Sequence, residues 1–322
     1  GAGISVKMSA SWFAELSGVP MIGVTGTRGK STVTHLVHAI LKEAGYTALL
    51  GGNVRGVSNL ALLDEAKEDS VAVFELDSWQ CQGFGEANIS PHIAVFTTLY
   101  PDHLNYYKNM DEYLEDKALI FLNQTEDDFL ILGLPVAEQI KKRYGDRIRA
   151  KILIADPGNF PAGWDIRIVG AHNLLNAVCA IEAARAFGVS DTFIKNALAE
   201  FPGVPGRLEL LREVRGVKIY NDTTSTTPVA TLAALYALPA LRVVLIAGGA
   251  DKGLDMSELV EALPAYVKKL ILLKGTGTEK LISANPQLFE NVPVYDSLAS
   301  ALQDAAHSAQ AGDIILFSPG IA

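Results

Sequence analysis

Short apolar runs rich in β-branched residues alternate with amphipathic stretches along the whole of this 322-residue chain. Continuous apolar runs are typical of strands that are buried on both faces, as strands of parallel sheets are. Amphipathic stretches between such runs are typical of helices that pack on the sheet. The alternation therefore predicts an α/β fold built from parallel βα units.

The first part of the chain is interpreted as one domain, residues 19–205, with a mostly parallel sheet. Its predicted strands are Met21 to Val24, Thr47 to Leu50, Val71 to Leu76, Ile93 to Thr97, Phe129 to Leu132 and Lys151 to Ile154. Its predicted helices are Ser31 to Glu43, Met110 to Leu122 and Leu174 to Ala186.

A linker is predicted at Phe201-Pro202-Gly203-Val204-Pro205-Gly206, where two prolines and two glycines interrupt the pattern. The pattern then restarts as a second, smaller Rossmann-like α/β domain, residues 206–322. Its predicted elements are strand Val217 to Tyr220, a helix from Val229, strand Arg242 to Ile246, helix Ser257 to Leu263, strand Lys269 to Leu273, helix Leu298 to Ser308 and strand Asp313 to Phe317. A loop and a helix would normally follow the last strand, so this end is expected to be truncated.

Composition and charge exclude several classes of protein. Hydrophobic residues make up 49% of the chain, which is enough for two cores and excludes global disorder. The formal net charge of −9 and the lack of a Lys/Arg cluster argue against nucleic acid as a partner. No apolar run approaches the roughly 20 residues of a membrane span, and Cys81 and Cys179 are too few for a disulfide framework. We expect a cytoplasmic monomer whose cysteines are small core residues.

The segment Thr25-Gly26-Thr27-Arg28-Gly29-Lys30-Ser31-Thr32 lies between a predicted strand and a predicted helix, as a phosphate-binding loop does. Its glycines let the backbone approach phosphates, Lys30 supplies a positive charge, and the Ser31 hydroxyl can reach Mg²⁺. The strict pattern G-x-x-x-x-G-K-[ST] fails because Val24 stands at its first glycine. We nevertheless predict that this loop binds the phosphates of ATP and that the first domain is a P-loop-type ATPase domain.

Side chains that suit a hard cation follow two of the predicted strands. Glu75 lies at the end of one strand, and Asp102 and His103 follow the strand that begins at Ile93. The carboxyl ends of parallel strands meet at one edge of the sheet, where ligands bind. Carboxylate oxygens are ligands that Mg²⁺ prefers, so a magnesium site is predicted there. Lys117 has no local pattern that distinguishes it from a solvated lysine.

Further motifs occur in a fixed order along the chain. They are Thr25-Gly26-Thr27-x-Gly29-Lys30-Ser31-Thr32, Gly52-Asn53, Glu75-Leu76-x-Ser78, Pro101-Asp102-His103-Leu104, Lys117, Gly170-x-His172-Asn173-x-x-Asn176, Gly206-Arg207-Leu208-Glu209, Asn221-Asp222 and Gly248-Gly249-x-Asp251-Lys252. Together they resemble the Mur ligase family, the ADP-forming amide ligases that build the peptidoglycan stem peptide. The resemblance extends from about Pro20 to Gly320.

The resemblance implies roles for these residues. The nucleotide would be bound by Gly26, Thr27, Arg28, Gly29, Lys30, Ser31, Thr32, Asn173, Asn176, Arg207 and Asp222, with the two asparagines at the adenine. Up to two Mg²⁺ ions would be bound by Ser31, Glu75, His103 and Lys117, which occupies the position that is carbamylated in the family. The catalytic residues would be Lys30, Lys117, His103 and Lys252. The substrates would be bound by Asn53, Asp77, Ser78, Thr224, Lys252 and Ser318.

Within the family the chain is most similar to the branch that adds glutamate to UDP-N-acetylmuramoyl-L-alanine through an acyl phosphate. Arg28 and Asp77 depart from the family's usual asparagine and serine. Thr224 stands where many members of the branch carry a lysine that helps to bind glutamate, so the choice between D- and L-glutamate stays open. Residues 1–18 would be the remnant of, or linker from, a missing N-terminal uridine-binding domain. Without that domain the chain is expected to bind nucleotide but not to ligate.

Three alternatives remain. Another ligase of the family, such as folylpolyglutamate synthase or the diaminopimelate- or lysine-adding enzyme, would share the ATP motifs and differ in substrate. A MurT-like amidotransferase partner subunit would typically carry a four-cysteine zinc insertion, which two cysteines argue against. A plain P-loop kinase or ATPase would leave Asn173, Asn176 and the second domain without a purpose.

Overall fold

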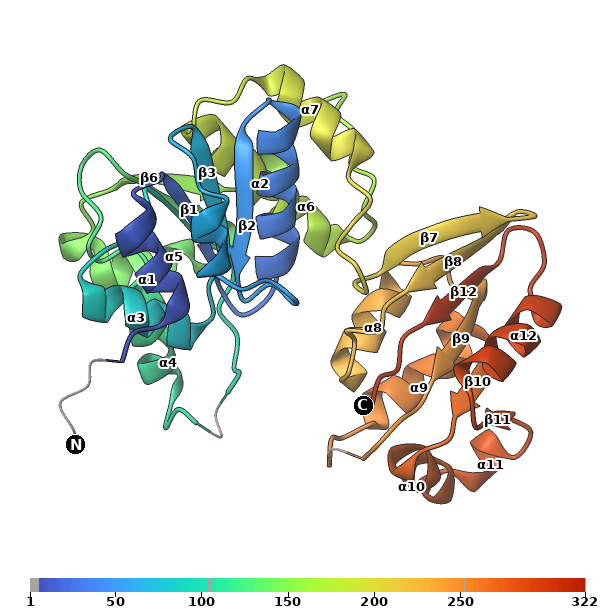
Figure 1. Cartoon of the computed structure of the whole chain (residues 1–322). Coiled ribbons are helices and arrows are strands. Elements are labelled where there is room, and N and C mark those ends of the chain that lie inside the picture. Colours follow the sequence, from blue (N-terminus) through green and yellow to red (C-terminus); the bar gives the residue numbers. More distant parts are fainter. Residues whose placement is uncertain (1–5, 104–105, 252, 322) are drawn as a thin grey trace. The chain divides into compact units, whose positions relative to one another are not determined.

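The chain forms two compact α/β units in the computed structural model, which describes residues 6–103, 106–251 and 253–321 apart from the side chain of residue 171. The first unit comprises Gly1–Arg167 and His172–Phe201, and the second comprises Ile168–Ala171 and Pro202–Ala322. Both are traced in Figure 1. The last change of unit falls between Phe201 and Pro202, inside the predicted linker. The predicted α/β fold class is confirmed.

The first unit is built on a six-stranded sheet in which every pairing is parallel. The strand order is β2-β3-β1-β4-β5-β6. The strands are β1 (Met21–Thr25), β2 (Thr47–Gly52), β3 (Ser70–Glu75), β4 (Ile93–Phe96), β5 (Phe129–Gly133) and β6 (Lys151–Ala155). All six lie within two residues of the predicted bounds, because continuous apolar runs identify strands that are buried on both faces.

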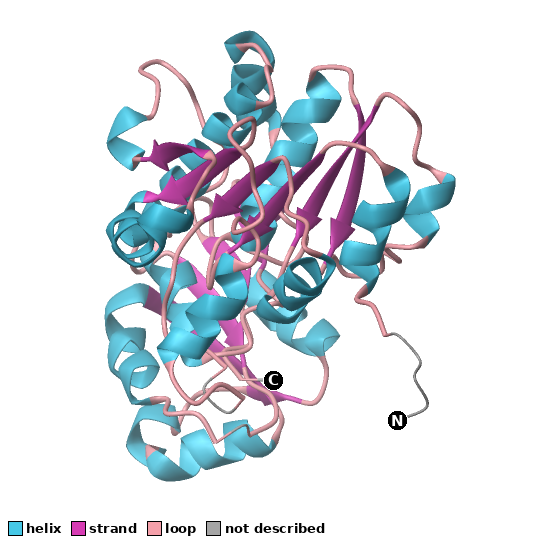
Figure 2. Ribbon diagram, turned by 90° about the vertical axis from the view of Figure 1, so that its left-hand side faces the viewer, coloured by secondary structure: helices cyan, strands magenta, loops and turns pink. Residues whose placement is uncertain are grey.

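Helices cover both faces of this sheet (Figures 1 and 2). They are α1 (Ser9–Ser17), α2 (Lys30–Glu43), α3 (Ser78–Ala87), α4 (Met110–Ala118), α5 (Leu134–Tyr144), α6 (Ala171–Ala186) and α7 (Asp191–Glu200). Buried side chains of α1, α3, α4 and α5 share one hydrophobic core with the sheet, and α2, α6 and α7 lie on the opposite face. Helix α4 ends earlier than predicted, and turns follow it.

Residues 1–18, interpreted from the sequence as the remnant of or linker from a further domain, include the packed helix α1. Ala10 and Phe13 of α1 are fully buried in the core of the first unit. The Phe13 ring lies against Phe74 of β3, with the ring centroids 4.9 Å apart. Helix α1 therefore forms part of the structural support of β3, the strand that ends at Glu75.

The second unit contains a mixed sheet in the order β11-β10-β9-β12-β8-β7. Its strands are β7 (Glu209–Val214), β8 (Val217–Asn221), β9 (Val243–Ala247), β10 (Val267–Leu273), β11 (Val294–Tyr295) and β12 (Ile314–Phe317). Pairings are parallel except at one edge, where β7 runs antiparallel to β8. The sequence analysis missed β7 because most of its residues are exposed, so it lacks an apolar run.

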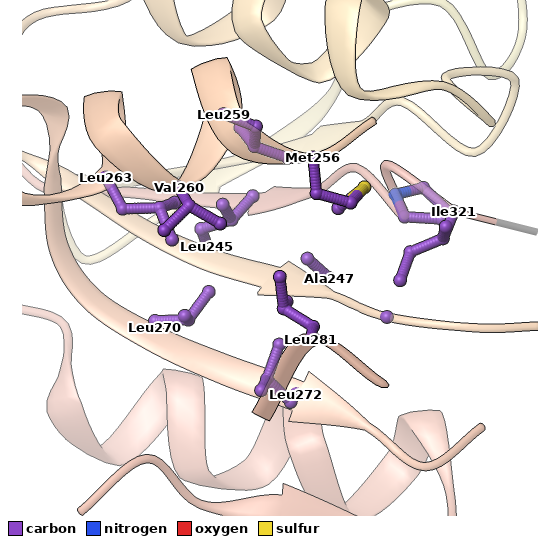
Figure 3. Close-up of a pocket in the computed structure, with 12 residues that line it drawn as sticks. Leu245, Ala247, Met256, Leu259, Val260, Leu263, Leu270, Leu272, Leu281 and Ile321 are labelled. Atoms are coloured by element: carbon purple, nitrogen blue, oxygen red, sulfur yellow. The ribbon is translucent and has the colours of Figure 1, made fainter. Parts of the chain in front are cut away.

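Helices of the second unit also lie on both faces of their sheet. They are α8 (Pro228–Tyr236), α9 (Ser257–Tyr266), α10 (Thr276–Ala284), α11 (Pro286–Phe289) and α12 (Leu298–Ser308). Helix α12 buries Ala301 and Ala305 on one face, and the other helices bury leucines and a phenylalanine on the opposite face. Figure 3 shows an apolar cavity in the latter core, between α9, α10 and the sheet. Its volume of about 10 Å³ leaves room for no more than one water, so it is a packing gap.

Across the described residues, the structure contains no helix with the length and apolar character needed to cross a membrane.

Candidate active site

The phosphate loop, Thr25 to Thr32, lies at a change of direction in the first sheet. The chain leaves β1 toward β2 on one side and leaves β4 toward β5 on the other, although β1 and β4 are neighbours. Ligands of open α/β sheets bind in the crevice at such a point, outside the carboxyl ends of the strands. The predicted loop therefore follows the strand whose end is best placed to receive a ligand.

Two glycines of the loop adopt backbone conformations that exclude other residues. Gly26 has a φ of 137°, and a Cβ there would lie 2.1 Å from Oγ1 of Thr97. Gly29 has a φ of 87° and forms the N-cap of α2, where a Cβ would lie 2.3 Å from Oδ1 of Asn176. Side chains from the residue after β4 and from α6 thus pack directly against the loop backbone, which only glycine permits.

Replacing Gly26 with alanine is expected to raise the dissociation constant for ADP by about tenfold or more, because the Thr97 hydroxyl must move and the loop with it. Gly45→Ala is the matched control, since Gly45 also has a positive φ, of 86°, but nothing lies within 4 Å of a Cβ there. The control should lose about 1–2 kcal/mol of stability and keep its affinity. Isothermal titration and thermal unfolding separate the two effects. Equal affinities for both variants would contradict the assignment.

Lys30 and Ser31 lie in the first turn of α2, where backbone N–H groups have no intrahelical acceptors. The Lys30 ammonium donates to the carbonyl oxygen of Thr27 at 3.1 Å, so it bends back over the loop. Ser31 is buried. This helix start combines N–H groups that lack intrahelical acceptors, a helix dipole and a positive side chain, which is the chemistry of an anion site.

The side chain of Arg28 is exposed at the tip of the loop. Its guanidinium carbon lies 5.3 Å from the centre of the Tyr100 ring, a cation–π contact. Within the described part of the chain it forms no ion pair with a carboxylate. The predicted departure from asparagine therefore adds a positive charge beside the phosphate loop.

Lys117 is 1% exposed, and its amino group lies beneath the loop. The Nζ atom donates to the Oγ1 atom of Thr25 at 3.3 Å and lies 4.8 Å from the centre of the Tyr113 ring. Thr25 Oγ1 in turn donates to the Leu76 carbonyl oxygen at 2.7 Å. Burial and the nearby positive charge of Lys30 lower the pKa of Lys117 to about 8. A lysine with no distinguishing local pattern is thus one of the most buried polar groups of the unit.

Glu75 and His103, two of the four predicted metal ligands, follow neighbouring parts of the same edge of the sheet: Glu75 ends β3, and His103 lies in the segment after β4. Glu75 is 5% exposed, and its carboxylate has no hydrogen-bond or ion-pair partner among the described residues. A nearly buried carboxylate without a partner is costly unless a cation neutralises it. The residues at this edge therefore fit Mg²⁺.

His103 has a φ of 53°, and its ring packs against Trp79 and Tyr113 with centroid distances of 4.9 and 6.0 Å. Its Nε2 atom lies 3.7 Å from Oδ2 of Asp102. No group of three or more His, Cys, Asp or Glu side chains that could bind a metal ion occurs in the described ranges.

The other residues predicted at this edge have mixed environments. Asn53 is exposed, and its N–H donates to the carbonyl oxygen of Glu75 at 2.7 Å. Asp77 is the N-cap of α3, where its carboxylate accepts from the N–H of Gln80 at 2.8 Å. Ser78 is 1% exposed. The side chain of Asn53 is thus exposed, that of Asp77 is half-buried and that of Ser78 is buried.

Asn173 and Asn176 lie on α6, one helical turn apart, and are buried. The Asn176 amide donates to Oδ1 of Asn173 at 2.9 Å. Because Asn176 packs against Gly29, the structure brings this predicted adenine-binding pair next to the phosphate loop.

In the second unit, a buried hydrogen-bond network contains two of the predicted ligand-binding residues. Ser318 donates to the Asp222 carboxylate at 2.8 Å, and the hydroxyl oxygens of Ser318 and Thr231 are 2.7 Å apart. The N–H of Leu208 also donates to Asp222 at 2.9 Å. Burial raises the pKa of Asp222 above the usual range of a carboxyl group. Ser318 is fully buried, so its hydroxyl holds the ends of β8 and β12 together.

Replacing Ser318 with alanine is expected to destabilise the second unit by about 1–3 kcal/mol, because one oxygen of the buried Asp222 carboxylate loses its donor. Ser300→Ala is the control, since Ser300 lies on α12 near the surface and away from this network. Urea unfolding would measure the difference between the two variants. An unchanged midpoint for Ser318→Ala would contradict a supporting role.

The remaining predicted residues of the second unit are placed as follows. Thr224 donates its hydroxyl to the carbonyl oxygen of Gly206 at 2.9 Å, which fixes the turn after β8. Arg207 is exposed. Lys252 lies outside the described residues. The second unit also has a pocket of about 410 Å³ whose lining includes Asp251, Leu254 and Lys280, with Lys280 paired to Asp251 at 2.9 Å.

Two known protein domains match most of the chain. The Mur ligase middle domain matches residues 24–154, and the Mur ligase glutamate ligase domain matches residues 206–320. The chain belongs to the Mur ligase family. The resemblance inferred from the motifs is thereby confirmed, and this Mur ligase is an enzyme that forms amide bonds at the expense of ATP.

Named relatives support a more specific comparison. The UDP-N-acetylmuramoylalanine--D-glutamate ligase of Roseiflexus sp. (strain RS-1) is 36% identical over 353 residues, which cover 100% of this chain and 75% of the relative. The enzyme of the same name from Streptococcus mutans serotype c is 34% identical and covers 94% of this chain and 70% of its own. E. coli FolC in complex with DHPP and ADP has a TM-score of 0.71 at 20% identity, over 99% of this chain and 91% of that chain, a likeness of fold.

Sequence analysis missed two residues that this Mur ligase uses to support the phosphate loop, Thr97 and Thr98. They directly follow β4, and their hydroxyls contact the backbone of the loop. No local pattern distinguishes these two threonines from the residues of an ordinary turn after an apolar strand. Only their position at the end of the strand next to β1 could have drawn attention to them.

Proposed function

We propose that this Mur ligase joins D-glutamate to UDP-N-acetylmuramoyl-L-alanine and converts ATP to ADP and phosphate, as a step of peptidoglycan biosynthesis. The names of its relatives support the choice of substrates. The observation that carries the proposal is the buried amino group of Lys117 beneath a phosphate loop, at the same edge of the sheet as Glu75. A simple ATPase has no need of this arrangement.

The reaction would proceed in two steps. A carboxylate oxygen of the alanyl residue attacks the γ-phosphorus of ATP, the bond to the β–γ bridging oxygen breaks, and ADP leaves. The amine of glutamate then attacks the carbonyl carbon of the acyl phosphate, loses a proton, and inorganic phosphate leaves. Lys30 and the first turn of α2 would hold the phosphates in line and neutralise their charge.

Mg²⁺ would neutralise charge on the phosphate oxygens when it is bound. Ser31, Glu75 and His103 would hold it together with carbamylated Lys117. Glu75 supplies a carboxylate that has no partner among the described residues, and Lys117 supplies an amine of lowered pKa. In carbamylation the neutral amine attacks carbon dioxide and loses a proton, which replaces a buried positive charge with an oxygen ligand.

The roles of the other predicted residues remain proposals. Asn173 and Asn176 would bind adenine through their amides, which both donate and accept hydrogen bonds. Arg207 and Asp222 would contribute to the nucleotide site, and Lys252 to the amino-acid site. The burial of Asp222 and Ser318 favours a supporting role for their side chains and contacts to ligand through neighbouring backbone.

The decisive experiment measures phosphate release by the full-length protein with ATP, Mg²⁺ and UDP-N-acetylmuramoyl-L-alanine while the amino acid is varied. Release should require both substrates and should be fastest with D-glutamate. A preference for L-glutamate or for lysine would place the chain in another branch of the family. Phosphate release that is independent of both substrates would contradict ligase activity.

A further inference from the structure

Thr97 and Thr98, which directly follow β4, contact the phosphate loop through a set of hydrogen bonds. We propose that this threonine pair positions the phosphate loop and determines which of its N–H groups are available to the nucleotide. The inference rests on the proposed ATP-dependent function and assigns a role to two residues outside the predicted site.

Thr98 forms hydrogen bonds with the backbone of two successive loop residues, Thr27 and Arg28. Its carbonyl oxygen accepts the N–H of Thr27 at 2.8 Å. Its hydroxyl accepts the N–H of Arg28 at 3.1 Å and lies 3.2 Å from the carbonyl oxygen of Arg28, to which it can donate. Thr27 and Arg28 lie in neither a helix nor a strand, so the Thr98 hydroxyl pairs backbone groups that regular secondary structure would otherwise pair.

Thr97 adds hydrogen bonds to the same segment of the loop, and we call the threonine pair with its hydrogen bonds to the loop the clamp. Its hydroxyl lies 2.6 Å from the carbonyl oxygen of Arg28 and 3.2 Å from that of Thr25. The same oxygen occupies the space that a side chain at Gly26 would need. Thr97 is fully buried and Thr98 is 7% exposed, so water competes little for these bonds.

The clamp has a direct consequence for phosphate binding. The N–H groups of Thr27 and Arg28 are already paired with Thr98 and so are not available to an anion. The N–H groups that begin α2, from Gly29 onward, lack intrahelical acceptors. A phosphate is therefore directed to the helix start, where the dipole and Lys30 also favour it. In many phosphate loops the preceding residues contribute N–H groups as well.

The clamp also connects the loop to the segment that carries His103. Tyr100 donates its N–H to the hydroxyl of Thr27 at 3.0 Å, three residues before His103. The segment from Thr97 to His103 thus begins at the phosphate loop and ends at a proposed metal ligand. Loss of the threonine pair should therefore affect ligands that carry phosphate and leave adenosine unaffected.

The test compares Thr98→Val, which keeps the shape but lacks the hydroxyl, with Thr98→Ser, which keeps the hydroxyl. Dissociation constants for Mg·ADP and for adenosine are measured by isothermal titration, together with thermal unfolding. Thr98→Val should weaken ADP binding by about tenfold to 100-fold and leave adenosine binding within about threefold. Thr98→Ser should stay close to the parent for both ligands.

Thr34→Val is the matched control, because Thr34 is fully buried on α2 and its hydroxyl has no hydrogen-bond partner in the described part of the chain. It should leave both affinities unchanged. If Thr98→Val does not fold, Thr98→Ala gives the same comparison. Unchanged ADP affinity in the variant that lacks the hydroxyl would overturn the inference, as would equal losses for ADP and adenosine. Failure of the parent protein to bind ADP would instead count against the proposed function.

Discussion

Replacing Lys30 with alanine is expected to lower the rate of ATP-dependent ligation by about 100-fold or more, a loss typical of removing one group that stabilises developing charge. The Lys30 ammonium is held over the loop by the Thr27 carbonyl at 3.1 Å, at the start of α2. Its charge would act on the phosphate oxygens, where negative charge is transferred. Phosphate release at saturating ATP and at limiting ATP measures the effects on kcat and on kcat/KM.

Lys42→Ala is the matched control for Lys30→Ala. Lys42 lies in the last turn of the same helix, at the opposite end from the loop, and is exposed. The control removes the same charge from the same helix, so it should leave ligation unchanged. Product formation by Lys30→Ala at the parental rate would show that the phosphate-loop assignment is wrong.

The sequence predicted all six strands of the first unit and β8, β9, β10 and β12 of the second, because their physical signal is local. A strand buried on both faces must be apolar at every position, and β1 and β9 are buried throughout. The order of these strands was also readable, from the alternation itself. The fold class and the loop therefore followed from the residues alone.

Helix α3 shows why some elements were not readable. It contains Gly83 and Gly85, which weaken the helical signal in a sequence. In the structure these glycines allow close packing, because a Cβ would lie 2.6 Å from Met8 at Gly83 and 2.8 Å from Leu119 at Gly85. The reason for each glycine is therefore a tertiary contact, which the local pattern does not contain.

The site residues also fall into those that the sequence made predictable and those that it did not. Lys30 and Ser31 were predicted from the spacing of the loop, and Glu75 was predicted from its position at a strand end. Lys117 came only from the family resemblance, because a lysine in a helix rich in acidic residues reads as solvated. Thr97 and Thr98 act through tertiary hydrogen bonds and were not found. Residues that follow a local sequence pattern, such as the spacing of a phosphate loop, could thus be predicted. Residues that support the loop through tertiary hydrogen bonds could not.

Replacing Lys117 with methionine is expected to reduce ligation by at least about 100-fold while the protein stays as stable as the parent or becomes more stable. The loss follows if carbamylated Lys117 is a direct ligand of the metal, since removing even an indirect partner of a metal ligand costs about 10- to 100-fold. The stability follows because methionine has a similar volume and carries no charge to bury. Thr25 still donates its hydroxyl to Leu76.

The stability difference should depend on pH and on carbon dioxide. The pKa of Lys117 is lowered to about 8, so below that pH the uncarbamylated folded protein holds a buried ammonium at a cost of about 3 kcal/mol. Between pH 8 and 10.5 the unfolded chain binds more protons than the folded one, so the stability of the parent rises with pH. In buffer depleted of carbon dioxide, the advantage of Lys117→Met should therefore be largest at neutral pH and should disappear toward pH 10.5.

Carbamylation itself has a direct signature. In ¹³C-bicarbonate near pH 8, where about half of the uncarbamylated Lys117 amine is neutral, the parent should give a carbamate carbon resonance that Lys117→Met lacks. Lys108→Met is the control, since its side chain is 86% exposed and its loss should change neither the resonance nor the activity. Ligation by Lys117→Met at the parental rate would remove Lys117 from the mechanism. A resonance that persists in Lys117→Met would place the carbamate on another amine. Loss of activity together with the resonance, in a protein of undiminished stability, is the combination that a buried lysine with only a structural role cannot produce.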